Sequence, residues 1–202
     1  MRFRNAIVAL VVILPAAVAA QTTDSLSLQG RHMLAVGLGA TGTREASTSA
    51  SGTTARATGV LATLSYARFV SPSLAIEVAA TAFDASASVS SASTRASAAT
   101  ALLIGLRYAP PQLAITPAVR PYVSAAGGPY LRGTSTSGPA GINTTTQFDG
   151  VARLGAGASF HIARHVVLGL EGDYHAVRGF DVAASDPTGL SLTVGLGFTW
   201  GR

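Results

Sequence analysis

Large apolar residues and small or polar residues alternate strictly along the last part of the chain. Between Leu190 and Trp200 every second residue is a large apolar side chain, and the residues between them are Ser, Thr or Gly. This period of two predicts a β-strand whose two faces differ. One face is apolar along its whole length, so either a protein core or a lipid bilayer must cover it.

Seven earlier segments show a comparable strand-like pattern, although the Gly-rich sequence of one of them, residues 120–130, does not fix which of its positions share a face. The eight predicted strands are residues 32–41, 57–69, 74–83, 96–108, 120–130, 148–162, 166–176 and 190–200. They predict an all-β chain.

The links between the predicted strands come in two sizes. Long links rich in Ser, Thr, Gly and Ala follow the first, third, fifth and seventh strands, at residues 42–56, 84–95, 132–147 and 177–188. The links after the second and sixth strands are short, and the link at residues 109–118 carries three prolines. Long and short links that alternate in this way are typical of an antiparallel up-and-down barrel.

Charged residues share one face wherever the alternation is clear, and this face is opposite the large apolar one. An arginine on the lipid face of a membrane barrel costs about 2–4 kcal/mol at the bilayer midplane. Charges inside the barrel are tolerated if they meet opposite charges. We therefore predict a paired interior network made of Glu77, Arg107, Arg153, Glu171 and Asp173.

Aromatic residues occupy the apolar face near the ends of the predicted strands. They are Tyr66, Tyr108, Phe160, Tyr174, Phe198 and Trp200. Aromatic rings at such positions fit the interfacial girdles of membrane barrels. This pattern favours an eight-stranded transmembrane β-barrel over a soluble secreted sandwich or ligand-binding barrel, in which the charges would have the same spacing.

The composition agrees with a barrel. The mean hydropathy is +0.40, yet no run approaches the ~20 apolar residues of a membrane-spanning helix. Apolar residues are therefore spread over short segments. Cysteine is absent, which excludes disulfides, a thiolate nucleophile and a lipidated N-terminal cysteine.

The N-terminus has the pattern of a secretory signal. Arg2 and Arg4 precede an apolar segment at residues 6–18, and small residues follow it. We predict a cleaved signal peptide at residues 1–20, a short lead at 21–31 and a barrel domain at 32–202; an uncleaved anchor helix is the alternative. Cleavage leaves twelve arginines against nine acidic residues. Because the arginines are scattered singly, no nucleic-acid partner is predicted.

Two segments resemble a known family. Residues 66–77, Tyr-Ala-Arg-Phe-Val-Ser-Pro-Ser-Leu-Ala-Ile-Glu, and residues 120–130, Arg-Pro-Tyr-Val-Ser-Ala-Ala-Gly-Gly-Pro-Tyr, resemble elements of small outer-membrane β-barrel proteins such as the membrane domain of outer membrane protein A. The resemblance implies an eight-stranded barrel in bacterial outer-membrane lipid, assembly by the outer-membrane insertion machinery, and no cofactor. Family members usually end on an aromatic residue, whereas Gly201 and Arg202 follow Trp200 here.

Candidate chemistry is sparse. Asp173 and His175 share a face, so with a loop serine they could form part of an envelope lipid-modifying enzyme. No nucleophile-elbow pattern accompanies them, and a triad is recognised by geometry rather than composition. We interpret them as interior polar residues and predict no enzymatic activity. His161 and His165 flank a predicted turn, so no metal site is predicted.

The interior of an eight-stranded barrel is nearly filled by side chains. The Gly-x-Gly pairs at residues 155–157 and 195–197 lie within predicted strands, where glycine relieves crowding. The sequence therefore predicts a structural or surface-interaction role rather than a wide pore. It identifies no extracellular partner.

Overall fold

The computed structural model describes residues 28–44, 56–83, 87–89, 94–139, 141–178 and 189–201. The predicted signal peptide and most of the predicted lead lie outside these residues. Nine strands are described: β1 (His32–Arg44), β2 (Arg56–Phe69), β3 (Leu74–Phe83), β4 (Ala87–Val89), β5 (Thr94–Tyr108), β6 (Val119–Gly138), β7 (Gly141–Ala163), β8 (Val166–Arg178) and β9 (Gly189–Trp200). A single 3₁₀ turn, η2 (Pro111–Leu113), lies between β5 and β6. Within the described part of the chain, no helix has the length and apolar character needed to cross a membrane.

Eight strands form a closed antiparallel ring. The order β3-β2-β1-β9-β8-β7-β6-β5 is closed by pairing of β3 with β5, and the short β4 pairs only with β5 beyond the ring. The last strand pairs with the first along its length, from His32 opposite Trp200 to Thr43 opposite Gly189. The final strand therefore closes the ring against the first.

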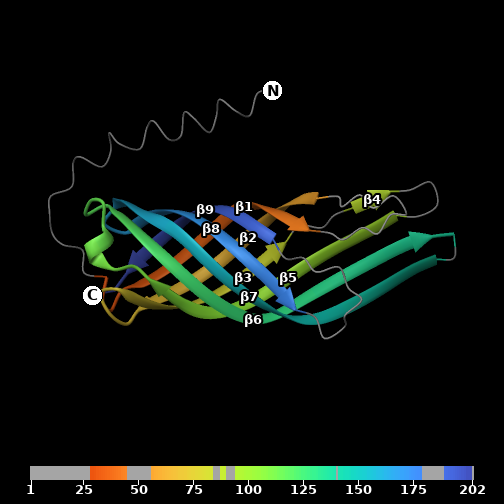
Figure 1. Ribbon diagram of the computed structural model, residues 1–202, viewed down its shortest axis with the longest axis horizontal. Helices are drawn as coiled ribbons and strands as arrows, with labels where there is room; N and C mark the ends of the chain where they lie inside the picture. Colours follow the sequence, from red (N-terminus) through yellow and green to blue (C-terminus); the bar gives the residue numbers. More distant parts are fainter. Residues whose placement is uncertain are drawn as a thin grey trace, which may run out of the picture.

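The two ends of the barrel differ. At one end, which we call the turn end, lie the short β2–β3 and β7–β8 turns, the β5–β6 connection and Trp200. At the other, the loop end, the β6–β7 hairpin extends beyond β1, β8 and β9 (Figure 1), and β5 stays paired with β6 almost to its end, with Thr94 opposite Ser137. Neighbouring antiparallel strands that are connected by short turns at one end leave their long connections at the other.

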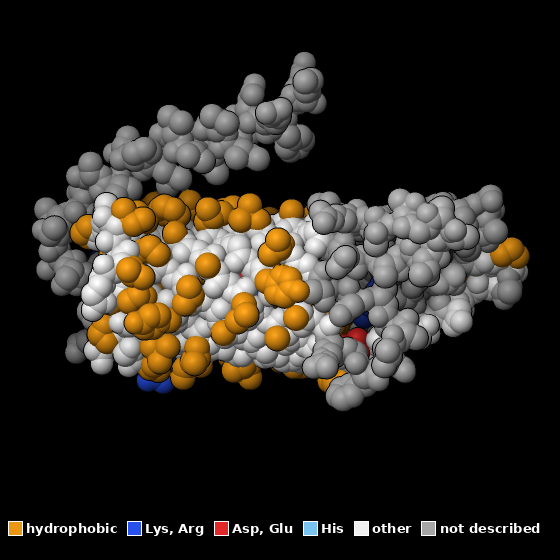
Figure 2. All heavy atoms as spheres, viewed as in Figure 1, with side chains coloured by type: hydrophobic (Ala, Val, Ile, Leu, Met, Phe, Trp, Pro, Cys, Tyr) orange, Lys and Arg blue, Asp and Glu red, His pale blue; other side chains and the backbone are white. Residues whose placement is uncertain are grey.

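Large apolar side chains point outward around the ring. Leu38 is 63% exposed, and Val36, Val60, Ile104 and Leu154 are likewise exposed. Figure 2 shows hydrophobic side chains spread over the barrel wall on the side seen. The inward positions hold polar and ion-paired residues together with apolar ones, whereas most of the large apolar side chains of the wall face outward, unlike the arrangement in a water-soluble protein.

The predicted loop at residues 132–147 is wrong. β6 continues to Gly138 and β7 begins at Gly141, with pairs running from Val119 opposite Phe160 to Gly138 opposite Gly141. Thr and Ser dominate this segment, and threonine's branched side chain favours extended backbone. A polar composition therefore does not by itself indicate irregular structure in this segment. In the same way, the predicted link at 84–95 contains β4 and the first residues of β5.

The projecting hairpin should be dispensable for folding. Residues 133 and 146 are directly paired, so an Asn-Gly turn can replace residues 134–145 without changing the register. The replacement removes the β6 partners of β5 residues 94–97, but the removed side chains that the structure describes contribute nothing to the buried interior. The free energy of unfolding in detergent should therefore change by only about 1 kcal/mol. Loss of the compact, unheated band on a gel would contradict this expectation.

Candidate functional site

The five predicted network residues come together inside the barrel. Glu77 lies on β3, Arg107 on β5, Arg153 on β7, and Glu171 and Asp173 on β8. Glu77, Arg107 and Arg153 are 3%, 6% and 4% exposed. Their strands are not all neighbours in the ring, so the side chains meet across the lumen. We call these five residues the interior network.

Glu77 is held between the two arginines. Arg153 Nη2 donates to Glu77 Oε1 at 2.7 Å, and Arg107 Nη2 lies 2.7 Å from Glu77 Oε2. One carboxylate therefore links β3 to β5 and β7. Ion pairs buried in this way depend on each partner, because removing one leaves an uncompensated buried charge.

The two acids of β8 make longer contacts with the same arginines. Arg107 Nη2 lies 3.8 Å from Glu171 Oε2, and Arg153 Nε lies 3.7 Å from Asp173 Oδ1. Ser124 Oγ donates to Glu171 Oε1 at 2.7 Å. The network thus brings three carboxylates to two guanidinium groups. The ion pairs of Glu77 are shorter than those of Glu171 and Asp173.

Two residues of β6 complete the site. The guanidinium carbon of Arg107 lies 4.3 Å from the centre of the Tyr122 ring, a cation–π geometry. Tyr122 and Ser124 escaped the sequence analysis because the faces of this strand were not assigned. Arg120 on the same strand could have assigned the faces. If its charge points inward, the alternate residues 122 and 124 point inward as well, and all three residues are buried.

Glycines on β7 make room for these groups. Gly155 is paired with Ser124 on one side and Asp173 on the other. A Cβ added to Gly155 would lie 2.6 Å from Ser124 Oγ and 2.9 Å from Glu171 Oε1. A Cβ at Gly157 would lie 2.8 Å from the Tyr122 ring. The interpretation that these glycines relieve crowding in a narrow barrel agrees with this geometry.

Apolar clusters lie on both sides of the network along the barrel axis. The first, towards the loop end, consists of Ala79, Ala101, Leu103, Tyr130, Val151 and Val177. The second, towards the turn end, consists of Leu28, Met33, Ala67, Phe69 and Ala75. The inward residues of β3 show the order directly: Ala75, Glu77 and Ala79 belong to one cluster, the network and the other cluster. Apolar side chains therefore pack against the network from both directions along the barrel axis.

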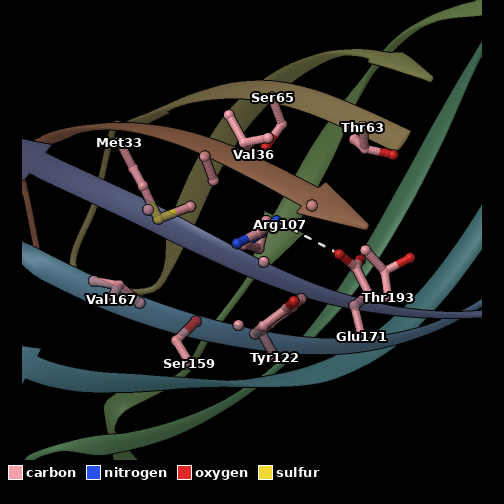
Figure 3. Close-up of a pocket in the computed structure, with 15 residues that line it drawn as sticks. Met33, Val36, Thr63, Ser65, Arg107, Tyr122, Ser159, Val167, Glu171 and Thr193 are labelled. Atoms are coloured by element: carbon pink, nitrogen blue, oxygen red, sulfur yellow. Dashed lines mark ion pairs between the residues drawn. The ribbon is translucent and has the colours of Figure 1, made fainter. Parts of the chain in front are cut away.

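A cavity of about 50 Å³ lies beside the network. Arg107, Tyr122 and Glu171 line it together with small residues: Thr193 lies beside Glu171, and Thr63 and Ser65 lie on another side (Figure 3). The volume suits a few water molecules and is far below the ~300–1,000 Å³ of typical ligand pockets.

The residues considered for catalysis do not form a triad. Among the described residues, His175 Nε2 lies 3.0 Å from Ser191 Oγ, and Ser191 is a residue of β9. His175 Nδ1 has no hydrogen-bond partner in the described part of the chain, whereas Asp173 faces Arg153. All of these groups are buried in the lumen, where no large substrate can reach them. No cluster of potential metal ligands occurs among the described residues.

The six predicted girdle residues occupy outward positions. Tyr66, Tyr108, Phe198 and Trp200 are exposed near the turn end, and Tyr174 is exposed nearer the loop end. Phe160, opposite Leu168 near the turn end, is half-buried. The structure therefore places the described rings mainly at one end of the barrel.

Replacement of Glu77 by Gln should destabilise the barrel by about 3–5 kcal/mol, because two buried guanidinium groups lose their shared counter-charge. Glu171→Gln should cost less, since Ser124 can still donate to an amide oxygen. Denaturant unfolding in detergent measures both. Equal midpoints for Glu77→Gln and the parent would contradict the clamping role of Glu77.

Gly155→Ala should cost about 1–3 kcal/mol through overpacking of the network. Gly172→Ala is the matched control on the outward face of the next strand, where the nearest atoms to an added Cβ are 3.9 Å away. The same unfolding measurement should show a clear loss for the first variant only. Comparable losses in both would mean that the effect comes from the backbone of the sheet.

Comparison with solved structures identifies the fold. The chain is similar to the attachment invasion locus protein Ail of Yersinia pestis, with a TM-score of 0.59, 12% identity and coverage of 85% of this chain and 99% of Ail. It is also similar to Neisserial surface protein A, with a TM-score of 0.56, 15% identity and coverage of 86% and 98%. A major outer membrane protein from Thermus thermophilus matches with a TM-score of 0.55, 12% identity and coverage of 84% and 99%.

No protein-family model and no curated protein sequence matches the chain. At these identities the structural likeness establishes the fold alone. The chain has the fold of the small eight-stranded outer-membrane β-barrels.

Proposed function

We propose that this chain is an integral protein of a bacterial outer membrane with a structural and surface-interaction role. The observation that carries the proposal is the closed ring whose outward face is apolar and whose inward face holds an ion-paired network. In water, the outward Leu, Val and Ile side chains would be costly to expose, whereas lipid covers them. A closed ring also leaves no unpaired strand edge within the bilayer.

The orientation follows from the two kinds of connection. In outer-membrane barrels short turns face the periplasm and long connections face outside. The turn end is accordingly periplasmic, and the β6–β7 hairpin projects from the cell. The signal peptide at residues 1–20 would direct export, and the outer-membrane insertion machinery would assemble the barrel.

The surface role falls to the hairpin. The segment from Gly133 to Thr146 is rich in Thr and Ser and lies beyond the apolar wall. At about 3.3 Å per residue, seven residues of β6 beyond Leu131 extend about 20 Å along the strand. Such a paired, polar arm offers hydroxyl groups and backbone to partners outside the cell.

The alternatives have weaker support. A wide pore requires an open lumen, but the network and its flanking apolar clusters fill the described lumen except for small cavities. For a barrel enzyme, the described residues supply no triad, because His175 contacts Ser191 and Asp173 faces Arg153. A soluble barrel would have to expose the outward apolar face to water. The proposal therefore includes neither wide diffusion nor catalysis.

An arginine scan on the outward face distinguishes the membrane from water. Leu38→Arg should destabilise the protein in lipid by about 2–4 kcal/mol, because the charge would lie within the bilayer. Ile142 is 77% exposed on the hairpin, so Ile142→Arg should be nearly neutral. Unfolding from vesicles measures both. If Leu38→Arg is also neutral, and the protein is water-extractable without a heat-dependent gel shift, the membrane proposal fails.

A further inference from the structure

The described part of the turn end carries basic residues and no acidic ones. Arg31 precedes β1, Arg68 lies near the end of β2, and Arg164 lies in the β7–β8 turn. The acidic residues that the structure describes, Glu77, Asp149, Glu171 and Asp173, lie in the network or towards the loop end. Arg120 also lies at the turn end but is buried inside the barrel. We call Arg31, Arg68 and Arg164 the basic rim.

A continuous row of rings lies on the outward face beside the basic rim. Ring centres are separated by 5.9 Å between Tyr66 and His32, 5.7 Å between His32 and Trp200, 6.2 Å between Trp200 and Phe198, and 5.7 Å between Phe198 and His165. His32 Nδ1 lies 2.6 Å from the Tyr66 hydroxyl. These five residues, the aromatic shelf, cross the seam at which β9 closes against β1.

Strand register places the arginines around this shelf. Arg68 is directly opposite His32, and His32 is opposite Trp200. On the other side, Thr199 N donates to His165 O at 2.8 Å, which fixes the β7–β8 turn next to the end of β9. Arg31 Nη1 donates to Arg164 O at 3.5 Å. Arg68 and Arg164 are exposed, so their guanidinium groups are accessible from the lipid interface.

This combination suits a phospholipid headgroup. Aromatic rings lie at headgroup depth, and a guanidinium group can form two parallel hydrogen bonds to a phosphate. A zwitterionic lipid brings a compensating ammonium group, which the basic rim would repel, whereas an anionic phospholipid does not. Each arginine near an anionic membrane surface changes binding by about fivefold.

We propose that the basic rim and the aromatic shelf form a site for anionic phospholipids in the inner leaflet of the outer membrane. Headgroup phosphates contact Arg68 on one side of the aromatic shelf or Arg164 on the other, and the acyl chains lie along Leu34 and Phe198. Because the shelf faces outward, the site takes a lipid rather than a periplasmic polymer. The inference rests on the membrane location and orientation proposed above.

Trp200 is the single tryptophan of the chain, so its fluorescence reports directly from this site. The full barrel is inserted into phosphatidylcholine vesicles that contain a minor fraction of phosphatidylglycerol, with bromine on the acyl chains of one lipid or the other. Brominated phosphatidylglycerol should quench Trp200 more strongly than the same fraction of brominated phosphatidylcholine. The preference should weaken at high salt.

Variants separate charge at the rim from charge elsewhere. Arg68→Gln with Arg164→Gln should reduce the preference by about fivefold for each arginine, whereas the matching double change to Lys should retain most of it. Arg132→Gln with Arg178→Gln removes two charges from strand positions towards the loop end and should leave it unchanged. Equal quenching by the two lipids in the parent, or a preference that survives in the Gln variant, would overturn the inference. Failure of the parent to insert into either vesicle would instead overturn the proposed membrane location.

Discussion

The clamp that Arg107 and Arg153 form on Glu77 is the interaction on which the interior depends. The three residues come from β5, β7 and β3, so a single carboxylate connects distant parts of the ring through the lumen. Buried ion pairs gain little over a well-packed apolar core, yet they are costly to break. The barrel is therefore committed to one arrangement of these strands, because any other would leave a guanidinium group buried without a counter-charge.

The clamp also determines which residues its neighbours can be. Long side chains enter the lumen from β3, β5, β6 and β7, so glycine at 155 and 157 gives Ser124, Glu171 and Tyr122 the space they occupy. On the opposite wall, small residues of β1, β2 and β9 leave the 50 Å³ cavity. An eight-stranded barrel with this filling has room for water but not for a diffusion path. The closed lumen leaves the two ends and the outward face as the surfaces available for function.

Much of this organisation was predictable because alternation reports directly on the two faces of a strand. The bounds of β3 and the inward direction of Glu77, Arg107 and Arg153 follow from the period of two. The length of the β6–β7 hairpin does not follow from it, because the polar composition suggested irregular structure, whereas β-branched Thr residues form paired strands there. Leu28 could not be assigned to an apolar cluster, since it precedes the first strand and no local pattern marks it. The side-chain contact between His175 and Ser191 depends on the register of β8 against β9, which a single sequence does not contain.

The residue after Trp200 has a backbone conformation that favours glycine. Proteins of the resembling family usually end on an aromatic residue, whereas Gly201 and Arg202 follow Trp200. Gly201 has a φ of +95°, and a Cβ there would lie 3.1 Å from Gly30 O and 3.2 Å from His32 Cδ2. The left-handed residue thus turns the chain away from the strand direction directly after Trp200. Trp200 remains opposite His32 at the last paired position. Trp200 therefore keeps its place at the turn end, and glycine is the residue type that most readily adopts the left-handed backbone that follows it.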